Sequence, residues 1–473
     1  MPTFIPKALE LAKCIPRPKM GKHIIGKEVC DLLVIFENNI IIFSDKYCAF
    51  PSSGNLERDW CRWFKRAIWD SAKQLWGAER WIKEHPDRLF VDRLCTTPLP
   101  IPLPPPEIAK YILIVVAHGS GEPSQNVLGG SGSLMIDPEI VGARHFNPNL
   151  GTIKPFAVGR LSENKGFIHV IDDLSLDVLL RTLDTTPDLV RYLERKEAFV
   201  QSGLLGMAAG EEDLLAYYLQ HTDATDQHDF VFSKKYNNIL IGEGFWEAFQ
   251  VHPDRIAQIQ ENNVSYAWDL LVEHFTSHIL KGTTYFKNWE SVGDVEIALR
   301  FMARASRTER RMLSKALLGI IKVGAQNNRA LRVIKPTKMG DPFYVFLTLK
   351  PPTDKPYEEY RTVRKNLLQT TCEIVRYKFP EARDIVGIAT EPSGIEGSSE
   401  DLIYLDGSQW TAELDANAKE FSERFNILKE PKAYHVRELE YPKTDLKERG
   451  KGRNRNTRCS CGSGKKYKNC CGK

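Results

Sequence analysis

The sequence contains no uninterrupted apolar run of the roughly 18 residues that a membrane-spanning helix needs. Residues 1–20 lack an apolar core of about 7–15 residues, so they predict no secretory signal. The chain also has no internal repeat and no Gly-x-Ser-x-Gly nucleophile elbow. These absences argue against a membrane protein, a repeat protein and an α/β-hydrolase, and we expect a cytoplasmic protein without a membrane span.

The composition is that of an ordinary globular chain. Its 473 residues suffice for about three domains of ~150 residues each. Apolar residues make up 42% and charged residues 27%. The cysteines outside the C-terminal tail are scattered, which predicts reduced core thiols rather than a disulfide framework; they are Cys14, Cys30, Cys48, Cys61, Cys95 and Cys372.

Four further cysteines crowd the end of the chain: Cys459, Cys461, Cys470 and Cys471. Four thiolates this close together can reach one tetrahedral zinc ion. Gly462 and Gly464 suit the tight turns that the C-x-C and C-C pairs require. The segment is too short to bury an apolar core, so a metal is its best source of order. The alternative is a tail of reactive thiols or disulfides, but a cytosolic cluster more often binds metal.

The tail pattern C-x-C-G-S-G-K-K-Y-K-x-C-C-G resembles the SEC-C motif, which is named for the C-terminal tail of the SecA translocase ATPase. That family has Cys or His as its fourth ligand, which is Cys471 here. The resemblance covers Arg458 to Lys473 and implies one structural zinc ion. It leaves the role of the preceding residues open, because this motif occurs on many otherwise unrelated bacterial proteins.

Charge is unevenly distributed along the chain. The net formal charge is +4, yet residues 432–473 contain 13 Lys and Arg against 4 Asp and Glu, which leaves −5 for the rest. A basic tail on a mildly acidic body favours contact with nucleic acid or with an acidic protein surface. A solvated flexible linker explains the same pattern.

The pattern of apolar residues predicts a mixed α/β fold with an N-terminal αβββαβ-like domain. A short helix over 3–14, a β-hairpin over 26–47, a helix over 57–84 and a strand over 111–119 form the first unit. We expect a loop over 120–155, a strand over 167–172, and mostly helices over 173–220 and 244–332, the last of them a basic amphipathic helix over 307–322. Strands over 343–349, 385–390 and 401–406, with helices over 357–378 and 412–429, form a second small α/β unit.

These elements predict five segments. They are a restriction-endonuclease-like α/β domain (1–120), a mostly helical middle region (121–335), a small α/β unit (336–430), a basic linker (431–457) and the zinc-binding motif (458–473).

The hairpin carries the candidate catalytic residues Asp31, Asp45 and Lys46. Metal-dependent nucleases place carboxylates on adjacent strands to hold Mg²⁺ or Mn²⁺, with a lysine beside the attacking water. The stretch resembles the PD-(D/E)xK superfamily, whose core is αβββαβ with Glu on the first helix, Asp on one strand and Glu-x-Lys on the next. The resemblance implies metal-dependent phosphodiester hydrolysis, with Asp31 as metal ligand, Lys46 beside the water and Glu10 as a further acid.

One departure from that pattern bears on the chemistry. Ser44 stands two residues before Lys46, where the family has an acid, and Asp45 belongs to the opposite strand face. Either a bulge turns Asp45 toward Lys46, or the site has lost a carboxylate, or these residues form surface ion pairs on a plain hairpin. A non-catalytic adaptor that uses its basic zinc-binding tail is the alternative function.

A second, weaker signal follows the strand over 111–119. Ala117 to Gly121 has the glycines of a phosphate-binding loop, but the sequence predicts no helix after it.

Overall fold

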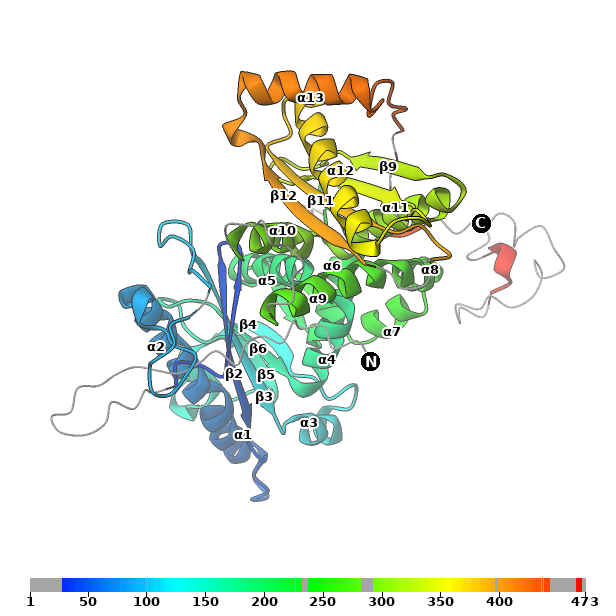
Figure 1. The fold of residues 1–473 in the computed structure, drawn as a ribbon. Coiled ribbons are helices and arrows are strands. Elements are labelled where there is room, and N and C mark those ends of the chain that lie inside the picture. The colour runs from blue at the N-terminus through cyan, green and yellow to red at the C-terminus, as the bar shows by residue number, and fades with distance from the viewer. Residues whose placement is uncertain are drawn as a thin grey trace, which may run out of the picture. The chain divides into compact units, whose positions relative to one another are not determined.

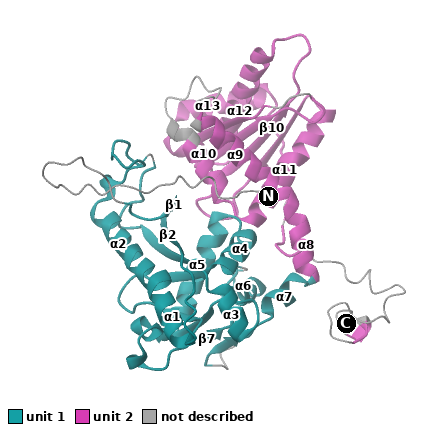
Figure 2. Ribbon diagram, turned by 90° about the horizontal axis from the view of Figure 1, so that it is seen from below, with its two compact units in different colours: residues 1–252 teal, residues 253–473 magenta. Residues whose placement is uncertain are grey.

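The computed structural model describes residues 28–99, 101–225, 227–231, 237–281, 292–395, 399–434, 436, 438–442 and 465–469. The chain divides into two compact units, Met1–His252 and Pro253–Lys473, which Figure 2 colours separately. Helices and three mixed sheets confirm the predicted α/β class. The predicted helix over 3–14 and the four tail cysteines lie outside the described residues.

Unit 1 contains two mixed sheets and their helices (Figure 1). Its strands are β1 (Leu32–Phe36), β2 (Asn39–Tyr47), β3 (Lys110–His118), β4 (Met135–Val141), β5 (Ala157–Arg160), β6 (Ile168–Asp172), β7 (Leu205–Ala208) and β8 (Ile239–Ile241). Its α-helices are α1 (Leu56–Phe64), α2 (Asp70–Glu84), α3 (Gly121–Leu128), α4 (Asp173–Thr182), α5 (Thr186–Gln201), α6 (Glu211–Gln220) and α7 (Phe245–Gln250).

The first sheet has the order β1-β2-β3-β6. β1 and β2 form the predicted antiparallel hairpin, whose turn begins at Glu37 with a φ of 53°. β2, β3 and β6 run parallel to one another, so the carboxyl ends of these three strands meet at one edge. Ligands of parallel sheets commonly bind at that edge, and it is therefore the first place to look for a site.

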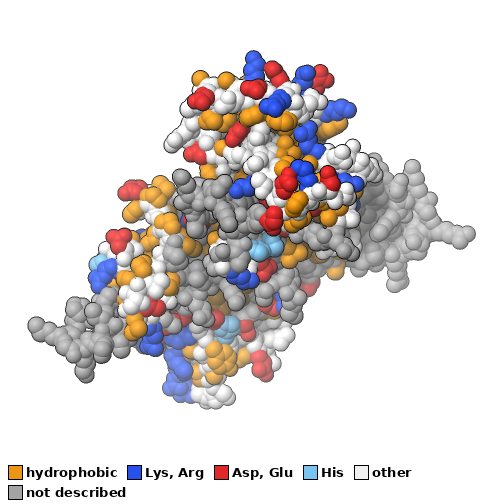
Figure 3. Space-filling view, in the orientation of Figure 1, with side chains coloured by type: hydrophobic (Ala, Val, Ile, Leu, Met, Phe, Trp, Pro, Cys, Tyr) orange, Lys and Arg blue, Asp and Glu red, His pale blue; other side chains and the backbone are white. Residues whose placement is uncertain are grey.

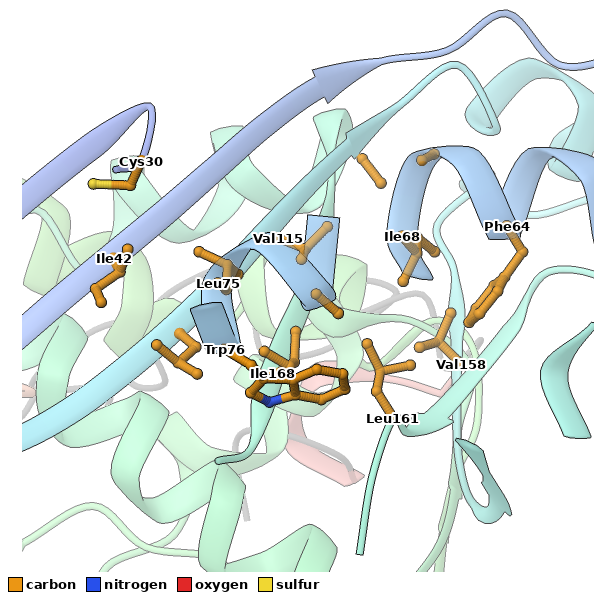
Figure 4. Packing of buried hydrophobic residues seen from close by; sticks show 14 of the residues in the cluster. Cys30, Ile42, Phe64, Ile68, Leu75, Trp76, Val115, Val158, Leu161 and Ile168 are labelled. Atoms are coloured by element: carbon orange, nitrogen blue, oxygen red, sulfur yellow. The ribbon is translucent and has the colours of Figure 1, made fainter. Parts of the chain in front are cut away.

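The helical segment between β2 and β3 covers one face of this sheet and forms the main core of the unit. A π-helical turn, Lys65–Trp69, joins α1 to α2, and together they confirm the helix predicted over 57–84. Trp63 is fully buried, and its indole donates to the Cys48 carbonyl at 2.9 Å. Figure 4 shows Trp76 and Ile68 of these helices packed with Val115 of β3. Burying indoles with their N–H groups bonded secures apolar area without an unsatisfied donor.

The second sheet of unit 1 corrects one expectation. Its order is β5-β4-β7-β8, and it includes residues from the stretch over 120–155 that we expected to be a loop. That stretch also contains α3 directly after β3. The stretch is rich in glycine and serine and has no long apolar run, so local pattern did not reveal a helix and strand that are stabilised by tertiary contacts.

Unit 2 contains one sheet with helices on both faces (Figure 1). Its strands are β9 (Arg329–Ile334), β10 (Phe343–Leu349), β11 (Asp384–Thr390) and β12 (Asp401–Asp406). Its α-helices are α8 (Pro253–Asn262), α9 (Tyr266–Leu280), α10 (Val292–Arg304), α11 (Arg307–Gln326), α12 (Tyr357–Lys378) and α13 (Ala412–Arg424).

The sheet of unit 2 has the order β12-β11-β10-β9, with β10 and β11 parallel and the outer pairs antiparallel. Alternate residues of β10 face opposite sides: Phe346 packs with α9, α10 and α11, and Val345 packs with α12. This arrangement makes three layers and confirms the predicted second α/β unit.

Helix α11 confirms the predicted basic helix over 307–322, but its arginines are not displayed to solvent. Arg307 and Arg310 are buried, and both pair with the buried carboxylate of Asp269. A buried guanidinium is stable only when it is paired and hydrogen-bonded. Sequence reasoning placed the charge on this helix correctly and could not place its partner, which lies on α9.

None of the helices within the described residues is long and apolar enough to cross a membrane.

Candidate functional site

The start of β1 and the end of β2 lie together at the carboxyl edge of the first sheet, as the hairpin predicts. The backbone N–H of Asp31 donates to the Phe43 carbonyl at 3.2 Å. In return, Oδ2 of Asp31 accepts from the backbone N–H of Asp45 at 2.7 Å. The Asp31 carboxylate therefore lies at the strand end that carries Lys46.

The register of β2 decides which side chains share a face. β2 pairs with β3 without a register shift from Asn39 to Tyr47, and its pairing with β1 is equally regular. In such a strand Ser44 and Lys46 point to one face and Asp45 to the other. Of the three arrangements that the sequence left open, the structure excludes the first, because no bulge turns Asp45 toward Lys46 between these paired residues.

Asp45 is bonded to a histidine that sequence reasoning did not single out. Its Oδ1 lies 2.7 Å from Nε2 of His118, the last residue of β3. The Asp45 side chain is 61% exposed and that of His118 is 26% exposed, so the pair faces solvent. Sequence alone could have found this pair only by assuming that β2 and β3 are parallel neighbours, which brings Asp45 and His118 to the same edge.

The three predicted residues therefore do not converge on one metal ion. Asp31 remains a carboxylate near Lys46, whereas Asp45 faces away and is engaged by His118. Among the residues that the structure describes, no group of three or more His, Cys, Asp or Glu side chains is arranged to hold a metal. The donor set of the hairpin thus does not by itself fit the Mg²⁺ or Mn²⁺ that the nuclease resemblance implies.

The turn after β3 has the strand–turn–helix form of a phosphate loop, contrary to our expectation that no helix follows. Gly119 has a φ of 102°, and a Cβ there would lie 2.3 Å from the Cys48 carbonyl, so only glycine fits. However, Oδ1 of Asp173 lies 3.8 Å from the position that a Cβ on Gly121 would take. A carboxylate beside the first residue of α3 disfavours a bound phosphate, and we assign no such site.

Two buried carboxylates lie close to each other near this edge: Asp172, which caps α4, and Glu212, in the first turn of α6. Asp172 accepts from the backbone N–H groups of Ser175 and Leu134 at 2.7 and 2.8 Å, and Glu212 accepts from the hydroxyls of Ser131 and Ser133. Burial raises the pKa of Asp172 to about 6 despite these hydrogen bonds from the backbone, and the charge of Glu212 adds to the rise. Both acids occupy helix N-termini, where negative charge is favourable. Their oxygens are used in holding the fold.

Residues 438–442, which we call the anchor segment, contact helices α8 and α11 of unit 2. The carbonyl groups and one carboxylate of this segment surround Arg311 of α11, whose side chain is fully buried. The guanidinium donates to the carbonyls of Leu439 and Glu440, and Oε1 of Glu438 lies 2.8 Å from its Nε. Asn262 supplies a further acceptor at 3.1 Å.

Two more contacts fasten the anchor segment to the same helices. Nζ of Lys315 lies 2.8 Å from Glu438 and 2.7 Å from Glu261, and these two acids raise the pKa of Lys315 against the opposing effect of its partial burial. Nε2 of Gln258 donates to Glu440 at 2.8 Å. Glu438 and Glu440 are thus the acids that tie an otherwise basic stretch of chain to α8 and α11.

Beyond the anchor segment, the structure describes residues 465–469 of the predicted zinc motif. Tyr467–Asn469 form a 3₁₀ turn in which the backbone N–H of Asn469 donates to the Lys466 carbonyl at 2.8 Å. This short turn lies between the two cysteine pairs in the sequence.

Comparison with known families identifies this tail. The family described as the SEC-C motif matches residues 455–473. No curated protein and no solved structure matches the chain. The motif is therefore present at the C-terminus, and the function of the two units has to be argued from their own residues.

The contacts of Arg311 predict how far the C-terminus can be shortened without loss of stability. Removing everything after Glu430 takes away the carboxylate and carbonyl partners that cover this guanidinium, and should lower the free energy of unfolding by about 1.5–3 kcal/mol. Ending the chain at Pro442 retains those partners and should change it by less than about 1 kcal/mol. Urea unfolding of the two truncated proteins beside the full chain measures the difference; equal loss from both truncations would refute this role of the anchor segment.

Proposed function

We propose that this protein is a zinc-binding adaptor, in which a folded α/β body holds a basic C-terminal tail for contact with nucleic acid. The observation that carries the proposal is the SEC-C match at residues 455–473, joined to a body by an anchor segment bonded to a buried arginine. The anchor segment fixes the point on α11 from which the tail leaves.

The chemistry of the tail suits this role. Cys459, Cys461, Cys470 and Cys471 provide four thiolates for one tetrahedral ion, which is the donor set of structural rather than catalytic zinc. When bound, the metal supplies the ordering free energy that so short a segment lacks. Lys465, Lys466 and Lys468 lie between the cysteine pairs and would present positive charge beside the tetrathiolate centre.

The distribution of charge supports the tail as the contact for an acidic partner. Residues 443–473 contain 11 Lys and Arg against 2 Asp and Glu, because the other two acids of the basic stretch belong to the anchor segment. On the face shown in Figure 3, acidic and basic side chains lie side by side on unit 2, whereas basic side chains gather over α1 of unit 1 and the turn that follows it, where Arg58, Arg62, Lys65 and Arg66 are exposed. Concentrated charge of one sign attracts a polyanion more strongly than a mixed surface does.

Zinc content provides the first check. The full chain should contain about one zinc ion per molecule, and a chain ending at Pro442 should contain none, by elemental analysis after removal of loosely bound metal. Cys470→Ser should lose the ion because it removes a ligand, whereas Cys372→Ser, in the core of unit 2, should retain it. Equal zinc in the full and shortened chains would rule out this metal site.

Binding of a labelled single-stranded oligonucleotide provides the second check, by fluorescence anisotropy. If the tail neutralises about four phosphates, the Kd should rise roughly 50-fold between 50 and 200 mM salt. Replacing Arg449, Lys451 and Arg453 with Gln should weaken binding at low salt. The matched control replaces Lys322, Lys350 and Lys419, which are exposed on the body. Equal binding by the full chain and the chain ending at Pro442, or by neither, would contradict contact through the tail.

A second candidate function is phosphodiester hydrolysis at the hairpin, and one contact favours it. The carboxylate of Asp31 bonds to the backbone one residue before Lys46, so an acid and a lysine remain together at a sheet edge. On the opposite face, Asp45 is bonded to His118, and this pair lies outside the candidate site. Because no group of three or more potential metal ligands exists among the residues that the structure describes, we assign no step to a metal ion.

Mutation of the hairpin separates this candidate from the adaptor. If the site hydrolyses nucleic acid, Asp31→Asn and Lys46→Ala should each reduce the rate by at least about 100-fold, in assays that include Mg²⁺, Mn²⁺ or a chelator. Asp45→Asn should cost less, because its side chain faces away from Lys46, and Lys73→Ala on α2 should cost nothing. If the wild-type protein cleaves neither single- nor double-stranded DNA or RNA, the hydrolase candidate is rejected and the adaptor is retained.

A further inference from the structure

One helical segment of unit 1 presents a row of cations to solvent, which we call the basic face. It consists of Arg58 and Arg62 of α1, and Lys65 and Arg66 of the π-helical turn that follows. All four side chains are exposed, and Figure 3 shows basic side chains gathered there. Because Arg58, Arg62 and Arg66 recur every four residues, they share one side of the helix over about 12 Å of its axis. Within the part of the chain that the structure describes, no carboxylate forms an ion pair with any of the four.

The acids of the same segment do not neutralise the basic face. Asp59 is buried, and its carboxylate accepts from the backbone N–H and the hydroxyl of Ser53 at 2.6 and 2.5 Å, so it is used at the start of the helix. Glu57 is exposed, but it lies neither three nor four residues from any of the four cations, which are the spacings at which helix side chains meet. The exposed charge of residues 57–66 is therefore four cations against one acid, or +3.

Helices elsewhere in this protein treat their exposed cations differently. Four of these cations, on α2, α4 and α10, each pair with an acid one turn away: Lys73 with Asp70, Lys83 with Glu79, Arg181 with Asp177, and Arg300 with Glu296. Like charges four residues apart on a helix repel each other. The repeat of Arg58, Arg62 and Arg66 therefore destabilises the helix, and no ion pair among the described residues offsets this repulsion. A bound polyanion would offset it.

The buried side of α1 narrows the kind of polyanion. Trp60, Trp63 and Phe64 are fully buried there, and the indole of Trp60 donates to the His145 carbonyl at 3.1 Å, which holds the cations in place before a partner arrives. Proteins that bind single strands use exposed aromatic side chains on which the bases stack. Helices that bind membrane surfaces insert an exposed apolar face. Because its aromatic side chains are in the core, α1 offers neither, and a regular row of phosphates suits it better.

We propose that the basic face binds the phosphate backbone of a nucleic-acid duplex. Each strand of a duplex carries one phosphate per about 3.4 Å of axis, so a row of about 12 Å spans three to four phosphates. Arginine suits such a contact, because its guanidinium makes two parallel hydrogen bonds to phosphate oxygens. Contacts of this kind do not read bases, so binding is independent of sequence. The inference stands apart from the tail, since all four residues belong to unit 1.

Fluorescence anisotropy with a labelled DNA duplex of about 16 base pairs tests this contact. The reference protein is the full chain with Arg449, Lys451 and Arg453 already replaced by Gln, so that the tail does not dominate. Replacing all four residues of the basic face with Gln should weaken binding at least about 20-fold at about 50 mM salt, and should reduce the slope of log affinity against log salt by about 3. The matched control replaces four exposed cations of unit 2 with Gln and should change binding less than about 2-fold; they are Lys322, Lys350, Lys378 and Lys419.

Three results would overturn the proposal. They are the absence of duplex binding by the reference protein, equal loss from the basic-face variant and the control, and equally tight binding of a single strand or of vesicles of phosphatidylcholine and phosphatidylserine. Because the substitutions remove repulsion between exposed like charges, the unfolding temperature of the basic-face variant should be unchanged or higher, so thermal unfolding separates a lost contact from a lost fold.

The same measurements keep this contact distinct from that of the tail. If the tail substitutions leave duplex binding unchanged and the basic-face substitutions abolish it, the basic face is supported without the tail. If the tail substitutions alone weaken duplex binding, the basic face is rejected and the tail contact stands.

Discussion

The burial of Arg311 is the constraint on which the C-terminal half of the molecule depends. Its guanidinium is removed from water on α11, and such a charge is tolerable only with partners on every side. The partners come from a segment more than a hundred residues later, through the carbonyls of Leu439 and Glu440 and the carboxylate of Glu438. Unit 2 therefore extends to the anchor segment, and the SEC-C motif follows a segment whose contacts with the folded body stabilise it.

In unit 1, the alternation of side chains along β2 limits which residues can act together in hydrolysis. Because β2 is regular, Ser44 and Lys46 share a face and Asp45 joins His118 on the other. The hairpin departs from the nuclease pattern that the sequence predicts, because a serine stands at one acid position. The neighbouring turn has the outline of a phosphate loop with a carboxylate beside it. One side chain disfavours each site: Ser44 in the hairpin and Asp173 beside the turn. For this reason we propose an adaptor rather than an enzyme.

Much of the fold could be predicted from local pattern, and the failures have a common cause. The helix over 357–378 and the strand over 343–349 have strong periodicity and clear ends, and the structure has both at the predicted residues. The hairpin is also present and ends at Tyr47 as predicted, but its first strand begins only at Leu32. The strand and helix within 120–155 have no such local pattern. They were therefore missed, because the contacts that stabilise them are long-range. In the candidate site, Asp31 and Lys46 could be found from spacing, whereas the Asp45–His118 bond needs β2 and β3 to be neighbours. The partners of Arg311 are equally non-local.

The central claim is that the buried arginine and the anchor segment are energetically coupled, so that the tail begins from a fixed place. A double-mutant cycle between Arg311→Met and Glu438→Gln, measured by urea unfolding of the full chain, tests it most directly. The account predicts that the two losses of stability do not add, with a coupling free energy of about 1.5–3 kcal/mol. Additivity within about 0.3 kcal/mol would contradict it, because independent effects would mean that Glu438 does not stabilise the buried charge.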